Sequence, residues 1–262
     1  MRVVILDSVD AVSQFAANDV CDLIHSRAKE SLGVVLGLAT GGTPLGLYRE
    51  LISRCSRGEV SFASVETFNL DEYVGVAPSC LQSYHFYMRE NLFRHIDIDL
   101  DKTHVPQTYQ VDLVESASNF ERLIEQACGI DLQILGIGAD GHIGFNEVGS
   151  SLGSRTRIKT LTNQTRQDNA RYFASLDVVP KTALTMGIGT IMESQAILLM
   201  ATGTGKAKAI NKMIEGPITA SVPASALQLH PNVTVVLDRD AASQLSSIDY
   251  FLASEHNRTT CL

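Results

Sequence analysis

The chain has 262 residues, of which 45% are hydrophobic and 19% are charged, so it can bury a sizeable core. Its 21 basic and 29 acidic residues give a net charge of −8, which disfavours nucleic acid and anionic membranes as partners. The N-terminal "MRVVILD" is too short an apolar run for a signal peptide, and no run approaches the ~18 residues of a membrane span. We therefore expect a cytoplasmic protein.

Cysteines do not form a recognisable framework in this sequence. Their number is odd, they are widely separated, and none forms a C-x-x-C pair, which argues against both a disulfide scaffold and a zinc site. We expect reduced thiols at Cys21, Cys55, Cys80, Cys128 and Cys261.

Short β-branched runs alternate with amphipathic stretches along the whole chain. The runs predict buried, mostly parallel strands at 3–6, 33–39, 65–70, 132–138, 196–202 and 233–238. Apolar stripes predict helices through Val12, Phe15, Ala16, Val20, Leu23 and Ile24, and through Leu113, Ala117, Phe120, Leu123, Ile124 and Ala127. This alternation predicts a three-layer α/β fold, a doubly wound open sheet of modified Rossmann-like type. We place no domain boundary within 1–262 and expect a helical C-terminal tail from about 240.

A glycine-rich turn follows the predicted strand at 33–39. Thr40, Gly41 and Gly42 lead to Thr43, a predicted N-cap, and to Pro44 at the first helical position. Free backbone N–H groups at such a turn suit a phosphate. A tight strand-to-helix connection with no ligand explains the same residues equally well.

Two other short motifs resemble known signatures but fail their tests. The "GTGK" at 203–206 is no Walker loop, because Ala207 replaces the Mg²⁺-binding hydroxyl and Met200 replaces the first glycine. Lys206 could still contact a phosphate as a point charge, or be an ordinary surface lysine. The "GSSLG" at 149–153 lacks the strand before Ser151 that a nucleophile elbow requires.

The segment "LGIGADGHIGFNE" contains a G-x-G-x-x-G at Gly136, Gly138 and Gly141. A dinucleotide site would place an acidic residue about 20 positions further on, whereas this chain has the basic "SRTRIKTL". Acidic residues within the loop would also repel a pyrophosphate. We interpret the glycine spacing as coincidental.

The same loop holds a histidine between two acids. A carboxylate beside His142, from Asp140 or Glu147, would fix the imidazole tautomer and raise its basicity, as a general acid/base requires. A structural hydrogen-bonding role for His142 is the alternative. A second carboxylate, Asp71, follows the strand at 65–70 with Glu72, on the same rim of the sheet, where it could remove a proton next to a carbonyl. An N-cap aspartate would explain Asp71 equally simply.

Six segments together resemble the glucosamine-6-phosphate deaminase family, in order and across nearly the whole chain: "LATGGTPLGLY", "FNLDEYVG", "GIGADGHIGFNE", "SSLGSRTRIKTLT", "ALTMGIGTIM" and "LQLHP". The resemblance implies a doubly wound α/β fold. It also implies conversion of glucosamine 6-phosphate and water to fructose 6-phosphate and ammonia, without a metal or other cofactor.

The resemblance also assigns roles to individual residues. It makes Asp71 the proton-transferring base and His142 the residue that helps to open the sugar ring, with Asp140 and Glu147 tuning the histidine. Its phosphate-binding positions fall on the Thr40–Thr43 turn, Arg171 and Lys206.

Three alternatives share parts of this pattern. A 6-phosphogluconolactonase has the same general fold and phosphate turn but does not need the "DEY" and "DGHIGFNE" segments. A sugar-phosphate-sensing regulatory domain would normally carry a DNA-binding helix pair before the first strand. A galactosamine-6-phosphate deaminase differs only in its choice of epimer.

Some members of the family are hexamers activated by N-acetylglucosamine 6-phosphate at subunit interfaces. The matching positions here are Ser150, Arg157, Lys159 and Tyr250, and two cations with a hydroxyl suit a second phosphate. The same residues could instead fasten a loop or an oligomer contact, and the sequence departs from the regulated pattern beyond Phe251. The resemblance thus implies a homo-oligomer, possibly a hexamer.

Overall fold

The computed structural model describes residues 1–260, and its main sheet is parallel throughout. The strand order is β1-β10-β9-β6-β2-β3-β5. All six predicted strands are present. The strands are β1 (Arg2–Leu6), β2 (Val34–Leu38), β3 (Val65–Asn69), β5 (Thr103–His104), β6 (Leu132–Leu135), β9 (Ala196–Ala201) and β10 (Val233–Asp238).

A second, antiparallel sheet was not predicted. It joins β4 (Asp71–Tyr73), β8 (Thr182–Thr185) and β7 (Arg157–Thr160). β7 reads "RIKT" and alternates between half-buried and exposed positions, so it lacks the continuous apolar run of a central strand. The two-residue strand β5 was missed for a similar reason, because it is too short to give a pattern.

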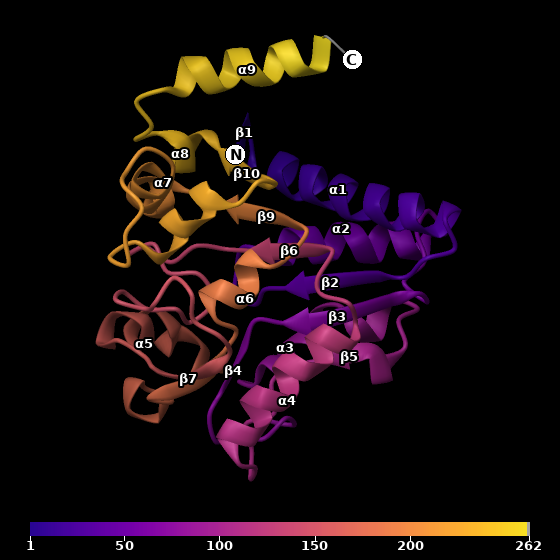
Figure 1. The fold of residues 1–262 in the computed structure, drawn as a ribbon, viewed down its shortest axis with the longest axis vertical. Helices are drawn as coiled ribbons and strands as arrows, with labels where there is room; N and C mark the ends of the chain where they lie inside the picture. Colours follow the sequence, from indigo (N-terminus) through magenta and orange to yellow (C-terminus); the bar gives the residue numbers. More distant parts are fainter. Residues whose placement is uncertain (261–262) are drawn as a thin grey trace.

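Helices cover both faces of the main sheet and confirm the three-layer α/β prediction (Figure 1). One face packs against α1 (Val9–Lys29), α2 (Leu45–Ser56) and α3 (Tyr84–Asn91). The other packs against α4 (Leu113–Gln126), α6 (Ile188–Met192), α7 (Ala207–Ile214) and α8 (Arg239–Ala242). The stripe predicted for α4 is wrong at Leu123, which is 36% exposed because it borders a surface hollow beside β5.

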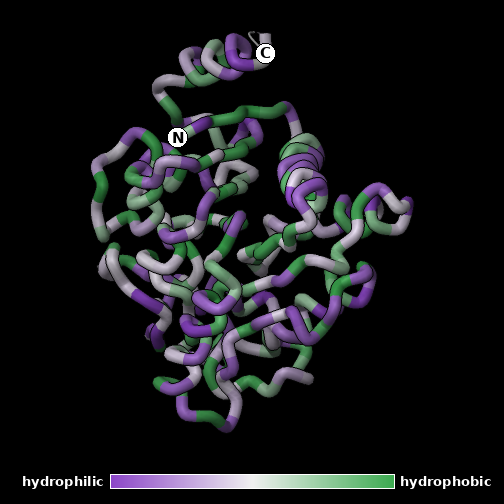
Figure 2. The backbone as a smooth tube through the Cα atoms, turned by 45° about the vertical axis from the view of Figure 1, so that its right-hand side comes forward, coloured by the Kyte–Doolittle hydropathy of each residue, from purple (hydrophilic) through white to green (hydrophobic). Residues whose placement is uncertain are grey.

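The last helix, α9 (Ile248–Thr260), lies outside these layers and against the edge strand β1 (Figure 1). Arg2 of β1 forms an ion pair with Glu255 of α9 and stacks over Phe15. The hydrophobic residues of α9 lie in its first half, and α9 lies on the same side of the molecule as the N-terminus (Figure 2). No helix in residues 1–260 is both long and apolar enough to cross a membrane.

Four of the five cysteines fall in the described part of the chain, and all four are free thiols. They are Cys21, Cys55, Cys80 and Cys128. Cys261 lies outside the described residues.

The strand order reverses between β2 and β6. From β2 the chain continues to its neighbour β3, whereas from β6 it reaches its other neighbour, β9. The loops that follow β2 and β6 therefore leave the sheet in opposite directions. A crevice opens between them at the carboxyl ends of the strands, which is where open α/β sheets bind ligands.

Candidate active site

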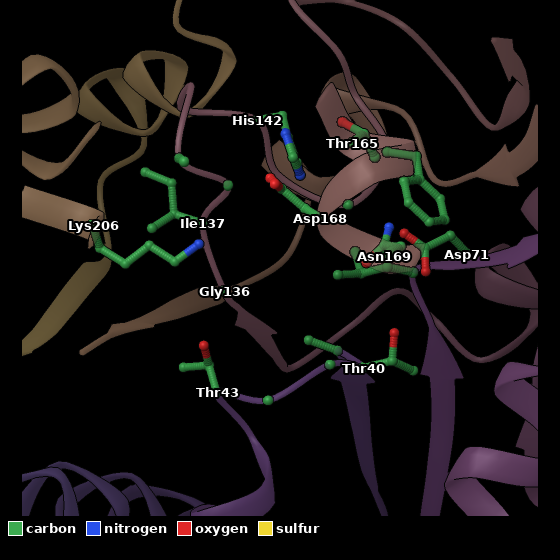
Figure 3. A pocket seen from close by; sticks show the side chains of 18 of the residues that line it. Thr40, Thr43, Asp71, Gly136, Ile137, His142, Thr165, Asp168, Asn169 and Lys206 are labelled. Atoms are coloured by element: carbon green, nitrogen blue, oxygen red, sulfur yellow. The ribbon is translucent and has the colours of Figure 1, made fainter. Parts of the chain in front are cut away.

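A pocket of ≈ 370 Å³ occupies this crevice. Its walls come from the turn after β2, the start of β4, the loop after β6, the segment after β9 and the short helix α5 (Asn163–Asn169). Side chains from these separate segments surround one cavity (Figure 3). The predicted residues that line it are Thr40, Gly41, Gly42, Thr43, Asp71, His142, Arg171 and Lys206.

The turn after β2 presents backbone rather than side chains. Gly41 has a φ of +91°, and a Cβ added at Gly41 or Gly42 would meet no atom within 4 Å, so the cradle is open. The predicted N-cap is wrong, because α2 begins at Leu45 with Pro44 as its cap and without a side-chain cap bond. Thr43 lines the pocket instead (Figure 3). The first N–H groups of α2 therefore remain free for an anion.

Two cations reach the same end of the pocket. Lys206 ends the short η5 turn (Thr204–Lys206) after β9, and burial lowers the pKa of its ammonium. Its amino group points into the cavity (Figure 3). Arg171, in η3 (Ala170–Tyr172), is exposed and lies over the Tyr172 ring at 4.8 Å from the ring centroid. A dianion placed at the turn would thus meet N–H dipoles and two positive charges.

Asp71 is the carboxylate that projects into the other end. It is 5% exposed, and burial together with the negative charge of Glu72 raises its pKa well above the ordinary value. The N-cap alternative is wrong, because Asp71 is the first residue of β4 and pairs with Thr185 of β8. A desolvated carboxylate with a raised pKa is a stronger base than one in water.

His142 and Asp140 form a bonded pair across from Asp71. The His142 Nδ1–H donates to Asp140 Oδ1 at 2.7 Å, in the tautomer that this partner requires. The same carboxylate accepts the His142 backbone N–H at 3.2 Å. The ring hydrogen bond lowers the pKa of Asp140 to about 2, so the carboxylate is ionised near neutral pH. The other ring nitrogen, Nε2, is left for a ligand.

Glu147 stands behind this pair rather than in the pocket wall. It is 2% exposed and accepts hydrogen bonds from the Thr162 backbone N–H at 2.9 Å and hydroxyl at 3.3 Å. Thr162 caps α5, so Glu147 connects the histidine loop to the helix that closes the pocket. Asp140, His142 and Glu147 offer ligand atoms within 4.8 Å of one another, the only such candidate cluster in residues 1–260. Both carboxylates already accept protein hydrogen bonds there.

The glycines of the histidine loop have local structural purposes. A Cβ at Gly138 would lie 2.2 Å from the His142 ring, and Gly141 has a φ of +93°. Gly144 has a φ of +55°, and a Cβ there would lie 3.1 Å from the Thr185 hydroxyl, so a side chain at this position would be strained. No helix begins in this loop, which agrees with the exclusion of a dinucleotide site. Gly138 lets the His142 ring lie across the turn, whereas a Cβ at Gly141 would meet Val222 at 2.6 Å, so these two glycines serve the packing of the loop itself.

Comparison with known proteins gives the family. The model of "Glucosamine-6-phosphate isomerases/6-phosphogluconolactonase" matches residues 7–236. The chain belongs to this family. It is 51% identical over 251 residues to a glucosamine-6-phosphate deaminase of Hahella chejuensis, covering 96% of this chain and 94% of that protein.

Solved structures of the family agree. A monomeric glucosamine-6-phosphate deaminase superposes with a TM-score of 0.90 at 48% identity, over 93% of this chain and 100% of that chain. A 6-phosphogluconolactonase from Trypanosoma cruzi shares the fold, with a TM-score of 0.71 at 22% identity over 94% and 97% of the two chains. The predicted resemblance and fold are confirmed.

Sequence reasoning missed several residues in the wall of this family's pocket. Those unpredicted polar residues are Arg49, Tyr84, Thr165, Asp168, Asn169 and Thr202. Three of them come from α5, whose sequence "NQTRQDN" has no feature that predicts a cavity wall. Arg49 lies one turn into α2. Its spacing from the glycine turn could have suggested that it lines the same pocket.

The residues that the resemblance assigns to activation are not assembled within one chain. Ser150 is buried, with its hydroxyl donated to the Glu147 carbonyl at 2.7 Å. Arg157 is half-buried and donates to Asn146 Oδ1 at 2.9 Å, and burial lowers its pKa. Lys159 lies two residues further along β7, whereas Tyr250, 69% exposed, lies on α9 at the opposite end of the molecule (Figure 1).

Proposed function

We propose that this chain converts glucosamine 6-phosphate and water to fructose 6-phosphate and ammonia. One observation carries the proposal: a buried Asp71 carboxylate and a carboxylate-bound His142 share a pocket with an open glycine turn and two cations. The turn suits the phosphate, and the two side chains suit proton transfers at the other end of a six-carbon sugar. The deaminases named above support it, since they match nearly the whole chain.

The first step is opening of the sugar ring. The phosphate binds at the Thr40–Thr43 turn with Lys206 and Arg171, which places C1 and C2 toward Asp71 and His142. His142 moves a proton from the C1 hydroxyl to the ring oxygen, and the C1–O5 bond breaks to leave an aldehyde. Asp140 holds the imidazole in one tautomer throughout.

The second step moves a proton between neighbouring carbons. Asp71 removes the C2 proton, the electrons shift to the aldehyde, and the aldehyde oxygen takes a proton from water, which gives an enolamine. Asp71 then delivers a proton to C1, which leaves an imine at C2. Water adds to the imine and the C2–N bond breaks, giving the ketone and ammonia. Asp71 carries the proton from C2 to C1 and is regenerated as a carboxylate, and water supplies the proton on the C1 oxygen and takes one back when ammonia leaves. The proposed reaction includes no metal or other cofactor.

Lactone hydrolysis and the other epimer are the competing activities. Hydrolysis of 6-phosphogluconolactone needs no base at C2, so a buried Asp71 would have no purpose in it. We assay ammonia release from glucosamine 6-phosphate, galactosamine 6-phosphate and unphosphorylated glucosamine, and acid release from the lactone. The proposal expects ammonia from the first at the highest kcat/KM. Faster lactone hydrolysis without ammonia overturns it, and preference for galactosamine 6-phosphate reassigns the epimer.

We also propose that the chain associates with copies of itself and that any activation depends on this association. Tyr250 lies far from Ser150, Arg157 and Lys159 within one chain, so a shared site for N-acetylglucosamine 6-phosphate requires a neighbouring chain to supply it. We expect activation only in an associated form, in the cytoplasm where sugar phosphates are retained. Velocity curves with and without this activator, alongside sedimentation, test it, and activation of a monomer would contradict it.

A further inference from the structure

Glu72 is a buried acid that the proposed reaction does not use. It follows Asp71 in β4, is 1% exposed, and points to the opposite face of that strand. Its Oε1 accepts the Tyr73 backbone N–H at 2.8 Å. Its Oε2 accepts the backbone N–H groups of Tyr84 at 2.8 Å and His85 at 3.1 Å, and the His85 Nδ1 lies 3.1 Å from the same oxygen.

These bonds fix the start of α3 to the strand that carries Asp71. Tyr84 is the first residue of α3, and two of the N–H groups that Glu72 satisfies are among those a helix leaves unpaired at its N-terminus. The Tyr84 ring lines the pocket and stacks on Phe145 at an interplanar angle of 13°. Its hydroxyl lies 3.3 Å from the Tyr73 hydroxyl. The position of this pocket wall therefore depends on a carboxylate that never touches the cavity.

We propose that Glu72 is a positioning residue for the reaction, which fixes α3 so that Tyr84 covers the pocket and places a second negative charge behind Asp71. This role rests on the proposed function, because it matters only if Asp71 acts as the base. The three backbone N–H groups that Glu72 accepts are the kind of donor that compensates a carboxylate for the loss of water on burial. The like charge next to Asp71 makes that acid hold its proton more tightly and makes it a stronger base.

The other ionisable groups around Asp71 do not raise its pKa as Glu72 does. Tyr73 and Tyr84 are phenols whose pKa values burial raises, so both are neutral near pH 7. His142 and Asp168 face Asp71 across the pocket, and neither is a source of its pKa shift. Glu72 is thus the charge whose removal moves the titration of Asp71.

The first test separates charge from packing with Glu72→Gln. Asp71 must be ionised to take a proton, so kcat/KM rises with pH as it ionises. Removing the neighbouring charge moves this acid limb to lower pH. Glu66→Gln is the matched control. Glu66 lies on β3 and does not line the pocket, and its carboxylate forms a hydrogen bond with His104 Nε2 of β5 at 2.8 Å. A limb that stays at the wild-type pH overturns the electrostatic role.

The second test measures how firmly Glu72 holds the start of α3, and it needs no enzyme assay. In Glu72→Ala, hydrogen exchange of the Tyr84 and His85 amides rises by about 10-fold to 10²-fold, while exchange in β10 stays unchanged. Unchanged exchange at α3 overturns the anchoring role, and the Glu72→Gln profile decides the charge role if the alanine variant does not fold. If wild-type protein releases no ammonia, the proposed function fails while the exchange result still stands.

Discussion

The two ends of the pocket are built differently. At the reaction end, Asp71 is buried, and His142 is held by Asp140. At the phosphate end, the turn around Gly41 presents open backbone, and Arg171 is exposed.

This difference follows from what each end must do. Proton transfer needs side chains held within tenths of an ångström before substrate arrives, so their hydrogen bonds come from the protein. Anchoring a dianion needs hydrogen-bond donors that the protein has not already used, so the N–H groups at the phosphate end are left for the ligand. Substitutions at the reaction end should therefore change kcat, whereas those at the phosphate end should change KM.

The largest effect is expected from Asp71→Asn. It removes the base while keeping the size of the side chain, so kcat should fall by roughly 10²- to 10⁴-fold with KM nearly unchanged. Steady-state ammonia release measures both constants. A variant that keeps more than about a tenth of the wild-type rate would show that Asp71 is not the base.

Asp140→Asn should cost less but act at the same end. The amide cannot hold His142 in its tautomer as the ionised carboxylate does, so kcat should fall by about 10²-fold.

The same variant, Asp140→Asn, also tests how this carboxylate contributes to stability. Because the folded pKa of Asp140 is lowered to about 2, its contribution is present above the ordinary value near 4 and is lost as pH falls toward 2. Urea unfolding at pH 7 and pH 2 should show a wild-type advantage only at pH 7.

The reaction end also shows what the sequence could predict. The glycine turn, the histidine loop and six of the seven strands of the main sheet are encoded in local runs and were predicted. The antiparallel sheet that carries Asp71 was not, because β8 pairs with β4, and β7 with β8, only through tertiary contacts between segments far apart in the chain. For the same reason, spacing alone did not nominate Arg171, and nothing in "NQTRQDN" predicted that α5 closes the pocket.

Lys206→Ala tests whether the phosphate end of the pocket controls substrate binding. Losing one charge-assisted contact to phosphate should raise KM by about 10-fold to 10²-fold with little change in kcat. Lys212→Ala, on the exposed side of α7, is the matched control. If kcat falls while KM holds, Lys206 belongs to the reaction end and the division of the pocket is wrong.

The smallest effect is expected from the turn itself. Gly41→Ala forces a side chain into a φ of +91°, which should cost about 1–3 kcal/mol of unfolding free energy. Gly42→Ala is the control, because its φ is not in the positive range and its surroundings are open. Denaturant unfolding compares the two variants. Equal stability would mean that the turn is not constrained as described.

A structure with an unreactive analogue tests the division of the pocket most directly. The open-chain amino alcohol of glucosamine 6-phosphate, reduced at C1, keeps the amine and phosphate but cannot complete the reaction. We expect its phosphate at the Thr40–Thr43 turn beside Lys206, with C2 next to Asp71 and the C1 end near His142. A phosphate bound away from the turn, or a ligand lying in the reverse direction, would contradict it.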